Sequence, residues 1–204
     1  MALSITQLPH ILFIHGSPSG RSGNSFTLSQ ELARSLSEQA EISELILSDQ
    51  QSAEQIQTAI DHADAFVFTT GTYWDSWGSP LQKFLEDFTQ LEGTPSYLGK
   101  PAAVLVTMHS VGGKSVLSRL QGVLNTLGLS IPPMSGLAYS YAAKLALETK
   151  IGASEADFWS PSDLERIAHN LMVAITLNAN SPAKFKSWEV DARDPRKLWV
   201  ESNV

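Results

Sequence analysis

The stretch HILFIHGSPSGRSGNS, residues 10–25, contains the two patterns that decide the fold. Its first six residues form a near-continuous apolar run, which is typical of a strand buried on both faces of a sheet. The ten residues that follow hold four serines and three glycines. Leu28, Leu32 and Leu36 then recur every four residues, as on the core-facing side of a helix. This loop is longer than a strand-to-helix turn needs, so we expect it to bind a ligand.

The same alternation of apolar runs and helical periods continues along the chain. The further strands that we predict are residues 41–47, 64–70, 100–108 and 129–136. The helix signals are a capping box at Ser52 and Gln55, an N-cap and N1 proline at Ser79 and Pro80, a terminating Gly128, and a last helix from Ser160 and Pro161. Strands that alternate with helices require crossover connections, which give a parallel sheet with helices on both faces. We therefore predict a doubly wound, flavodoxin-like α/β fold with strand order 2-1-3-4-5 and a ligand at the carboxyl ends of the strands.

Composition removes several classes of function. The 204 residues are 43% hydrophobic and 17% charged, which is typical of one globular domain, here residues 1–177, with an extension over residues 178–204. The absence of cysteine excludes disulfides and a cysteine nucleophile, and we assign no metal ligands. A formal charge of −7 argues against a nucleic-acid partner. No apolar stretch reaches the roughly 18 residues of a membrane span, so we expect no membrane partner and a cytoplasmic location.

Three familiar loop motifs do not match the serine- and glycine-rich loop or its neighbours. A dinucleotide fingerprint needs G-x-G-x-x-G, and no G-x-G occurs there. The sequence GGKS at residues 112–115 ends like a P-loop, but Met108 stands at the first glycine position. In GRSGN, residues 20–24, Asn24 replaces the final glycine of a nucleophile elbow. Backbone N–H groups, hydroxyls and a helix N-terminus favour a terminal phosphate, while a polar turn without a ligand is the remaining alternative.

A second informative stretch, TGTYWDSWGSPLQKFLED, covers residues 70–87. It places three aromatic residues, Tyr73, Trp74 and Trp77, at the same edge of the sheet as the first loop. Planar rings beside a phosphate site suit a ligand with a flat aromatic head group. The alternative is that each tryptophan packs on a neighbouring helix or subunit. A third loop, MHSVGGKS at residues 108–115, again follows a strand and offers glycines at a helix start.

Together these loops resemble those of the NAD(P)H-dependent FMN reductase and quinone reductase family of flavodoxin-like proteins. The sequence GSPSGRSGNS is similar to the family's phosphate loop, and TYWDSWGSPLQKFLED is similar to its flavin loop. Gly71 departs from the proline that the family often has. The binding residues that the resemblance implies are Ser17, Arg21, Ser22, Asn24 and Ser25 around the phosphate, Thr72, Tyr73, Trp74 and Ser76 at the ring, and His109, Gly112 and Gly113 near its far edge.

The resemblance implies an FMN-dependent oxidoreductase that passes a hydride from NADH or NADPH through FMN N5 to a small-molecule acceptor, without a catalytic side chain. The acceptor stays open between a flavin, a quinone, an azo compound and a metal oxyanion. A 2′-phosphate of NADPH has four candidate partners, Arg21, Lys83, Lys114 and Arg119. The alternatives are a flavodoxin-type electron carrier and a flavodoxin-like module that has lost its FMN site.

Aromatic residues in irregular segments also suggest self-association. Trp77, Phe185, Trp188 and Trp199 lie outside the predicted helices and strands. Such residues would leave more apolar surface than a monomer of this size exposes. We therefore expect a homodimer or a dimer of dimers, with the C-terminal extension as a possible dimer arm.

Overall fold

The computed structural model describes residues 8–148, 160–181 and 183–188. Their core is a five-stranded sheet in which every neighbouring pair of strands is parallel. The strands are β1 (His10–His15), β2 (Glu41–Ile46), β3 (Ala65–Gly71), β4 (Ala102–Met108) and β5 (Gly136–Ser140). Their order is β2-β1-β3-β4-β5, so the predicted flavodoxin-like topology is confirmed.

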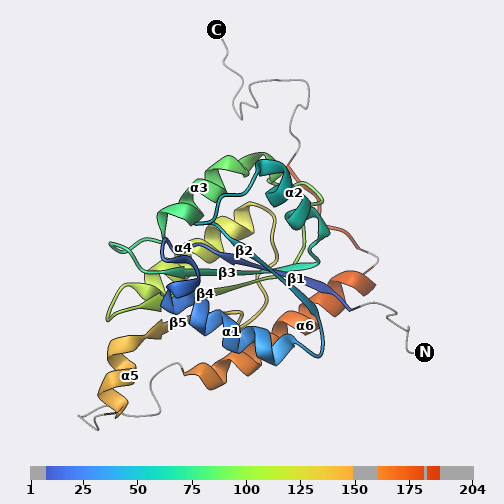
Figure 1. The fold of residues 1–204 in the computed structure, drawn as a ribbon. Helices are drawn as coiled ribbons and strands as arrows, with labels where there is room; N and C mark the ends of the chain where they lie inside the picture. The colour runs from blue at the N-terminus through green and yellow to red at the C-terminus, as the bar shows by residue number, and fades with distance from the viewer. Residues whose placement is uncertain (1–7, 149–159, 182, 189–204) are drawn as a thin grey trace.

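Helices cover both faces of this sheet (Figure 1). The helices are α1 (Asn24–Leu36), α2 (Ala53–His62), α3 (Ser79–Asp87), α4 (Gly113–Thr126), α5 (Tyr141–Glu148) and α6 (Leu164–Asn180). Side chains alternate along β1: Ile11 and Phe13 join α1 and α6 in one core, while Leu12 and Ile14 join α2, α3 and α4 in the other. Burial on both faces explains the unbroken apolar run that predicted this strand. Within the described ranges, no helix combines the length and the apolar character that crossing a bilayer requires.

Several local signals act as predicted. Ser52 and Gln55 form a reciprocal capping box at the start of α2. Gly128 follows the C-cap of α4 with a φ of 110°, a left-handed conformation that favours glycine. Ser160 and Asp163 form a capping box ahead of the short 3-10 helix η4 (Pro161–Asp163), which leads into α6.

The predicted fifth strand is present, but its predicted bounds, residues 129–136, are wrong. That segment contains Pro132 and Pro133, which have no N–H group to donate to a ladder. Ser130 forms an isolated bridge to Pro101, and the continuous ladder of β5 begins only at Gly136. Because the strand was placed too early, the helix α5 that follows it directly was not predicted.

The predicted N-cap of α3 at Ser79 is also wrong, because the N-cap is Gly78. The N–H group of Gly78 donates to the Thr70 hydroxyl at 2.9 Å. A Cβ atom on Gly78 would lie 2.3 Å from the carbonyl oxygen of Gly16. Gly78 is therefore the point at which the loop after β3 packs, backbone against backbone, on the loop after β1.

The C-terminal part of the described chain runs past the amino ends of the strands. Helix α6 ends at Asn180, so the proposed extension from residue 178 begins in its last turn. A Cβ on Gly99 would lie 2.7 Å from the ring of Phe185, which places residues 183–188 against the body of the protein. Trp199 lies outside the described residues.

Candidate functional site

A cleft of about 420 Å³ opens where three loops meet at the carboxyl ends of β1, β3 and β4. This is the edge at which doubly wound sheets bind their ligands. The lining residues are Ser17, Ser19, Ser22, Gly23, Asn24, Ser25, Gly71, Thr72, Tyr73, Thr107, Met108, His109, Tyr141 and Leu145. Two larger hollows, of about 560 and 840 Å³, lie at the opposite edge, beside the amino ends of the strands and α6.

One end of the cleft is formed by the N-terminus of α1. The N-cap of this helix is Gly23, which has no side chain to cap it, so N–H groups of the first turn remain available to an anion. Space here is tight, because a Cβ on Gly23 would lie 3.1 Å from the Ser17 hydroxyl and 3.3 Å from the carbonyl oxygen of Gly20. Glycine at this position lets the backbone and the Ser17 hydroxyl come together at the positive end of the helix.

The hydroxyls of this loop differ in what they already bind. Ser17 is 3% exposed, and its oxygen accepts the N–H of Ser19 at 3.2 Å. The Ser17 oxygen also lies 2.9 Å from the Tyr73 hydroxyl, across the cleft. The Ser22 hydroxyl, in contrast, donates its hydrogen to the carbonyl of Ser19 at 2.7 Å. Ser22 therefore has no hydrogen left for a phosphate unless that bond breaks.

The loop after β3 turns back on itself in a two-residue hairpin. Tyr73 and Ser76 exchange backbone hydrogen bonds of 2.8 and 2.9 Å. The two central residues, Trp74 and Asp75, have φ values of 48° and 58°, as in a type I′ turn. This turn leaves Trp74 fully exposed at the tip. Trp77 instead packs against the core, and its ring N–H donates to Gln82 at 2.8 Å.

The loop after β4 brings His109 to the cleft. The carbonyl of His109 accepts the N–H of Ala142 at 2.8 Å, which fixes the first turn of α5 beside the cleft. Gly112 and Gly113 face protein atoms: a Cβ on Gly112 would lie 2.4 Å from Asp75 Oδ1, and one on Gly113 would lie 2.6 Å from Met108 Sδ. These glycines therefore permit close packing between the loops.

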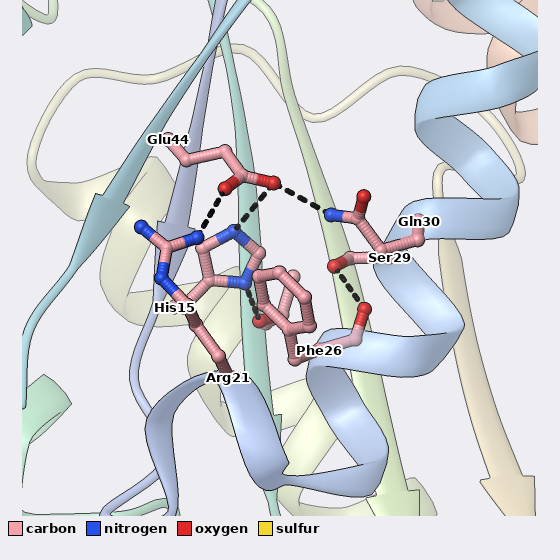
Figure 2. A network of polar contacts seen from close by, with 7 residues as sticks. His15, Arg21, Phe26, Ser29, Gln30 and Glu44 are labelled. Atoms are coloured by element: carbon pink, nitrogen blue, oxygen red, sulfur yellow. Dashed lines mark hydrogen bonds and ion pairs between the residues drawn. The ribbon is translucent and has the colours of Figure 1, made fainter.

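Arg21 does not line the cleft and belongs instead to a polar network with Glu44 (Figure 2). Its guanidinium donates to Glu44 at 2.8 Å and lies 5.7 Å from the centre of the Phe26 ring. Glu44 also accepts a hydrogen bond from Gln30 at 2.6 Å, and one of its oxygens lies 4.0 Å from His15 Nε2. His15 is 1% exposed, and burial lowers its pKa to about 4, against a smaller opposing effect of the Glu44 carboxylate.

Three candidates for a 2′-phosphate contact have partners within the protein. Arg21 pairs with Glu44. Lys83 pairs with Asp87 at 2.8 Å on the exposed face of α3. Arg119 donates to the carbonyl of Asp75, and its guanidinium lies 5.6 Å from the centre of the Trp77 ring.

Seven of the twelve predicted binding residues thus line one cleft: Ser17, Ser22, Asn24, Ser25, Thr72, Tyr73 and His109. The other five, Arg21, Trp74, Ser76, Gly112 and Gly113, do not line it. The sequence did not predict the other seven lining residues, which are Ser19, Gly23, Gly71, Thr107 and Met108 of the loops and strand ends and Tyr141 and Leu145 of α5. A correct placement of β5 would have identified Tyr141, because it follows the carboxyl end of that strand.

The donors of the cleft fit a flavin phosphate. Within residues 8–148, 160–181 and 183–188, no Asp, Glu, Lys or Arg side chain lines it. An anion would therefore meet N–H and hydroxyl donors without a carboxylate to repel it. The Thr72 hydroxyl is buried in the wall and has no hydrogen-bond partner among the described residues. A buried hydroxyl without a partner is costly, so a polar ligand atom would satisfy it.

A doubly wound parallel sheet with strand order 2-1-3-4-5 defines the flavodoxin-like class. Within this class, the chain belongs to the family described as NADPH-dependent FMN reductase, whose model matches residues 9–144. No curated protein matches the sequence.

Solved structures share the fold at low identity. An NADH:FMN oxidoreductase (EMOB) in its apo form is 17% identical over 88% of this chain and 95% of its own, with a TM-score of 0.65. FerB, a flavoenzyme NAD(P)H:acceptor oxidoreductase from Paracoccus denitrificans, is 18% identical over 84% and 99%, with a TM-score of 0.61. A flavodoxin from the domain Archaea is 11% identical over 82% and 99%, with a TM-score of 0.58.

Proposed function

We propose that this protein is an FMN-dependent oxidoreductase that uses NADH or NADPH to reduce a small-molecule acceptor. Family membership supports FMN-dependent oxidoreduction. The observation that carries the proposal for this chain is the cleft itself, in which hydrogen-bond donors of the α1 N-terminus and of Ser17 lie together, with the unpartnered Thr72 hydroxyl buried in the wall behind them.

The residues present suggest how the cofactor would be held. Ser17, Asn24 and Ser25, with the first-turn N–H groups of α1, would bind the phosphate. Thr72, Tyr73 and His109 would contact the remainder of the molecule. FMN, when bound, supplies hydride acceptance from a nicotinamide and donation to an acceptor. The side chains of the cleft then have to bind and orient the cofactor and leave it accessible to a nicotinamide, and the proposal requires no acid–base pair.

The test is reduction by nicotinamide without a partner protein. The protein is reconstituted with FMN, freed of excess cofactor, and titrated anaerobically with NADH and, separately, with NADPH while the flavin absorbance is recorded. Loss of the oxidised flavin absorbance with at least one of them is the expected result. FMN-loaded protein that keeps its absorbance with both contradicts the proposal.

A second candidate is a flavodoxin-type electron carrier. The observation that favours it is the formal charge of −7, which suits docking on basic protein partners. A carrier would bind FMN but would not be reduced by either nicotinamide until a partner reductase was added. The same titration therefore separates the two candidates.

We further propose a homodimer, or a dimer of such dimers, in which the C-terminal segment takes part. Phe185 and Trp188 are 66% and 70% exposed on this segment, and Leu177 of α6 is 66% exposed. Trp77 does not support this proposal, since it packs on its own chain. Light scattering of the parent and of a Phe185→Ser/Trp188→Ser variant is the test, with a dimer expected for the parent and dissociation for the variant. A monomeric parent at micromolar concentration contradicts it.

A further inference from the structure

The Tyr73 side chain extends from its hairpin back across Gly71 to the phosphate end of the cleft. A Cβ on Gly71 would lie 3.0 Å from Tyr73 Cε2 and 3.3 Å from the Tyr73 hydroxyl, so glycine leaves room for the ring. The hydroxyl then reaches Ser17 at 2.9 Å. Ser17 lies directly under Gly23, the N-cap of α1. An aromatic residue of the second loop thus contacts the anion-binding part of the first.

Counting donors and acceptors defines what Ser17 can do. A serine hydroxyl has one hydrogen to donate and two lone pairs that accept. The N–H group of Ser19 fills one lone pair. A phenol hydroxyl is more acidic than an aliphatic hydroxyl, so Tyr73 is the better hydrogen-bond donor of the two. With Tyr73 donating, both lone pairs of Ser17 are filled and its hydrogen remains for an acceptor at the α1 N-terminus.

We propose that Tyr73 is a positioning residue that makes Ser17 a dedicated hydrogen-bond donor to the terminal phosphate of FMN. This inference rests on the proposed function, because it requires that FMN binds in this cleft. The two hydrogen bonds, from Tyr73 to Ser17 and from Ser17 to the phosphate, are cooperative, because the first bond polarises the Ser17 hydroxyl that donates the second. Ser22 is the internal contrast, because its hydrogen is already given to the Ser19 carbonyl.

The test compares FMN with riboflavin, which lacks the phosphate. Dissociation constants for both are measured by flavin fluorescence for the parent, Tyr73→Phe, Ser17→Ala and the double variant. Tyr73→Phe should weaken the binding of FMN by about 3- to 10-fold and leave the binding of riboflavin unchanged. Ser17→Ala should weaken the binding of FMN by about 10- to 100-fold. The double variant should bind FMN like Ser17→Ala alone, because Tyr73 acts through Ser17.

Tyr97→Phe is the matched control, because Tyr97 is buried in the core and does not line the cleft. It should leave the ratio of FMN to riboflavin affinity unchanged. Equal FMN affinity of Tyr73→Phe and the parent would overturn the inference, and so would equal losses for FMN and riboflavin. A further loss from Tyr73→Phe in the Ser17→Ala background would assign Tyr73 a direct phosphate contact instead. A parent that binds no FMN would overturn the proposed function, and this inference with it.

Discussion

The loop after β1 and the loop after β3 meet at the same edge of the sheet, but they direct their side chains differently. In the first loop, Ser17 is 3% exposed and points under the N-terminus of α1. In the second, Trp74 is fully exposed at the tip of a hairpin, and only Tyr73 turns back towards the first loop. The place of the first loop could be predicted from the sequence, because it directly follows the apolar run of β1 and leads into the helical period of α1. The direction of an aromatic side chain in the second loop depends on the geometry of the hairpin turn, which the sequence did not predict.

The largest expected effect comes from pushing the two loops apart. In Gly78→Ala the new Cβ would lie 2.3 Å from the Gly16 carbonyl oxygen. Because this oxygen is a backbone atom, it cannot move aside as the end of a flexible side chain can. The free energy of unfolding should fall by about 3 kcal/mol, the upper end of the usual cost of overpacking. Urea denaturation measures it.

Gly122→Ala is the matched control for this substitution. A Cβ on Gly122 would meet no described atom within 4 Å, and the residue lies inside α4. Alanine should therefore stabilise the protein by about 0.5–1 kcal/mol. Similar changes for the two variants would contradict the close packing of the two loops at Gly78.

The next effect concerns the first loop alone. Asn24→Ala should weaken FMN binding by about 1–3 kcal/mol, through lost bonds to the phosphate, and should change riboflavin binding much less. Titration of both flavins measures the difference. Ser22→Ala should have the smaller effect on FMN, since the Ser22 hydroxyl hydrogen is held by the Ser19 carbonyl. A larger loss for Ser22→Ala than for Asn24→Ala would show that this bond exchanges for the phosphate.

A pH effect is expected at the base of the first loop. The pKa of His15 is lowered from 6.5 to about 4, so the folded protein holds it neutral while the unfolded chain binds a proton below about pH 6.5. The free energy of unfolding should fall as the pH drops from 6.5 towards 4, by up to about 1.4 kcal/mol per pH unit. Denaturation of the parent and of His15→Gln across this range is the measurement. Equal slopes for the two proteins would mean that His15 does not cause the loss.

The smallest effect belongs to the second loop. Trp74 has a φ of 48°, which asparagine tolerates better than tryptophan, so Trp74→Asn should stabilise the protein by about 0.5–1 kcal/mol. Because Trp74 does not line the cleft, FMN affinity should change less than about twofold. Thermal unfolding and FMN titration are the measurements. A loss of FMN affinity above about fivefold would place Trp74 among the ring contacts, as the family resemblance implies.

The fold was largely predictable because its signals are local. Apolar runs, the Ser52 capping box and Gly128 depend on neighbours within one element. The bounds of the fifth strand differ from the prediction because the run LSIPPMSG contains Pro132 and Pro133, whose missing N–H groups exclude a ladder. The N-cap of α3 was missed because Gly78 is required by contact with Gly16, far away in the sequence.

The site was predictable only where the backbone forms it. Ser17, Asn24 and Ser25 are brought to the cleft by the turn that leads into α1. The direction of Arg21 was not predictable, because Arg21 pairs with Glu44, which lies far away in the sequence on β2. The packing role of Gly112 was not predictable either, because it depends on the close approach of Asp75 from the second loop.

The central claim is that the α1 N-terminus and its loop bind the terminal phosphate of FMN. The most direct measurement is the affinity of the parent protein for FMN and for riboflavin under identical conditions. Charge-assisted bonds to the phosphate predict that FMN binds at least about 10-fold more tightly. Equal affinities for the two flavins would contradict the account.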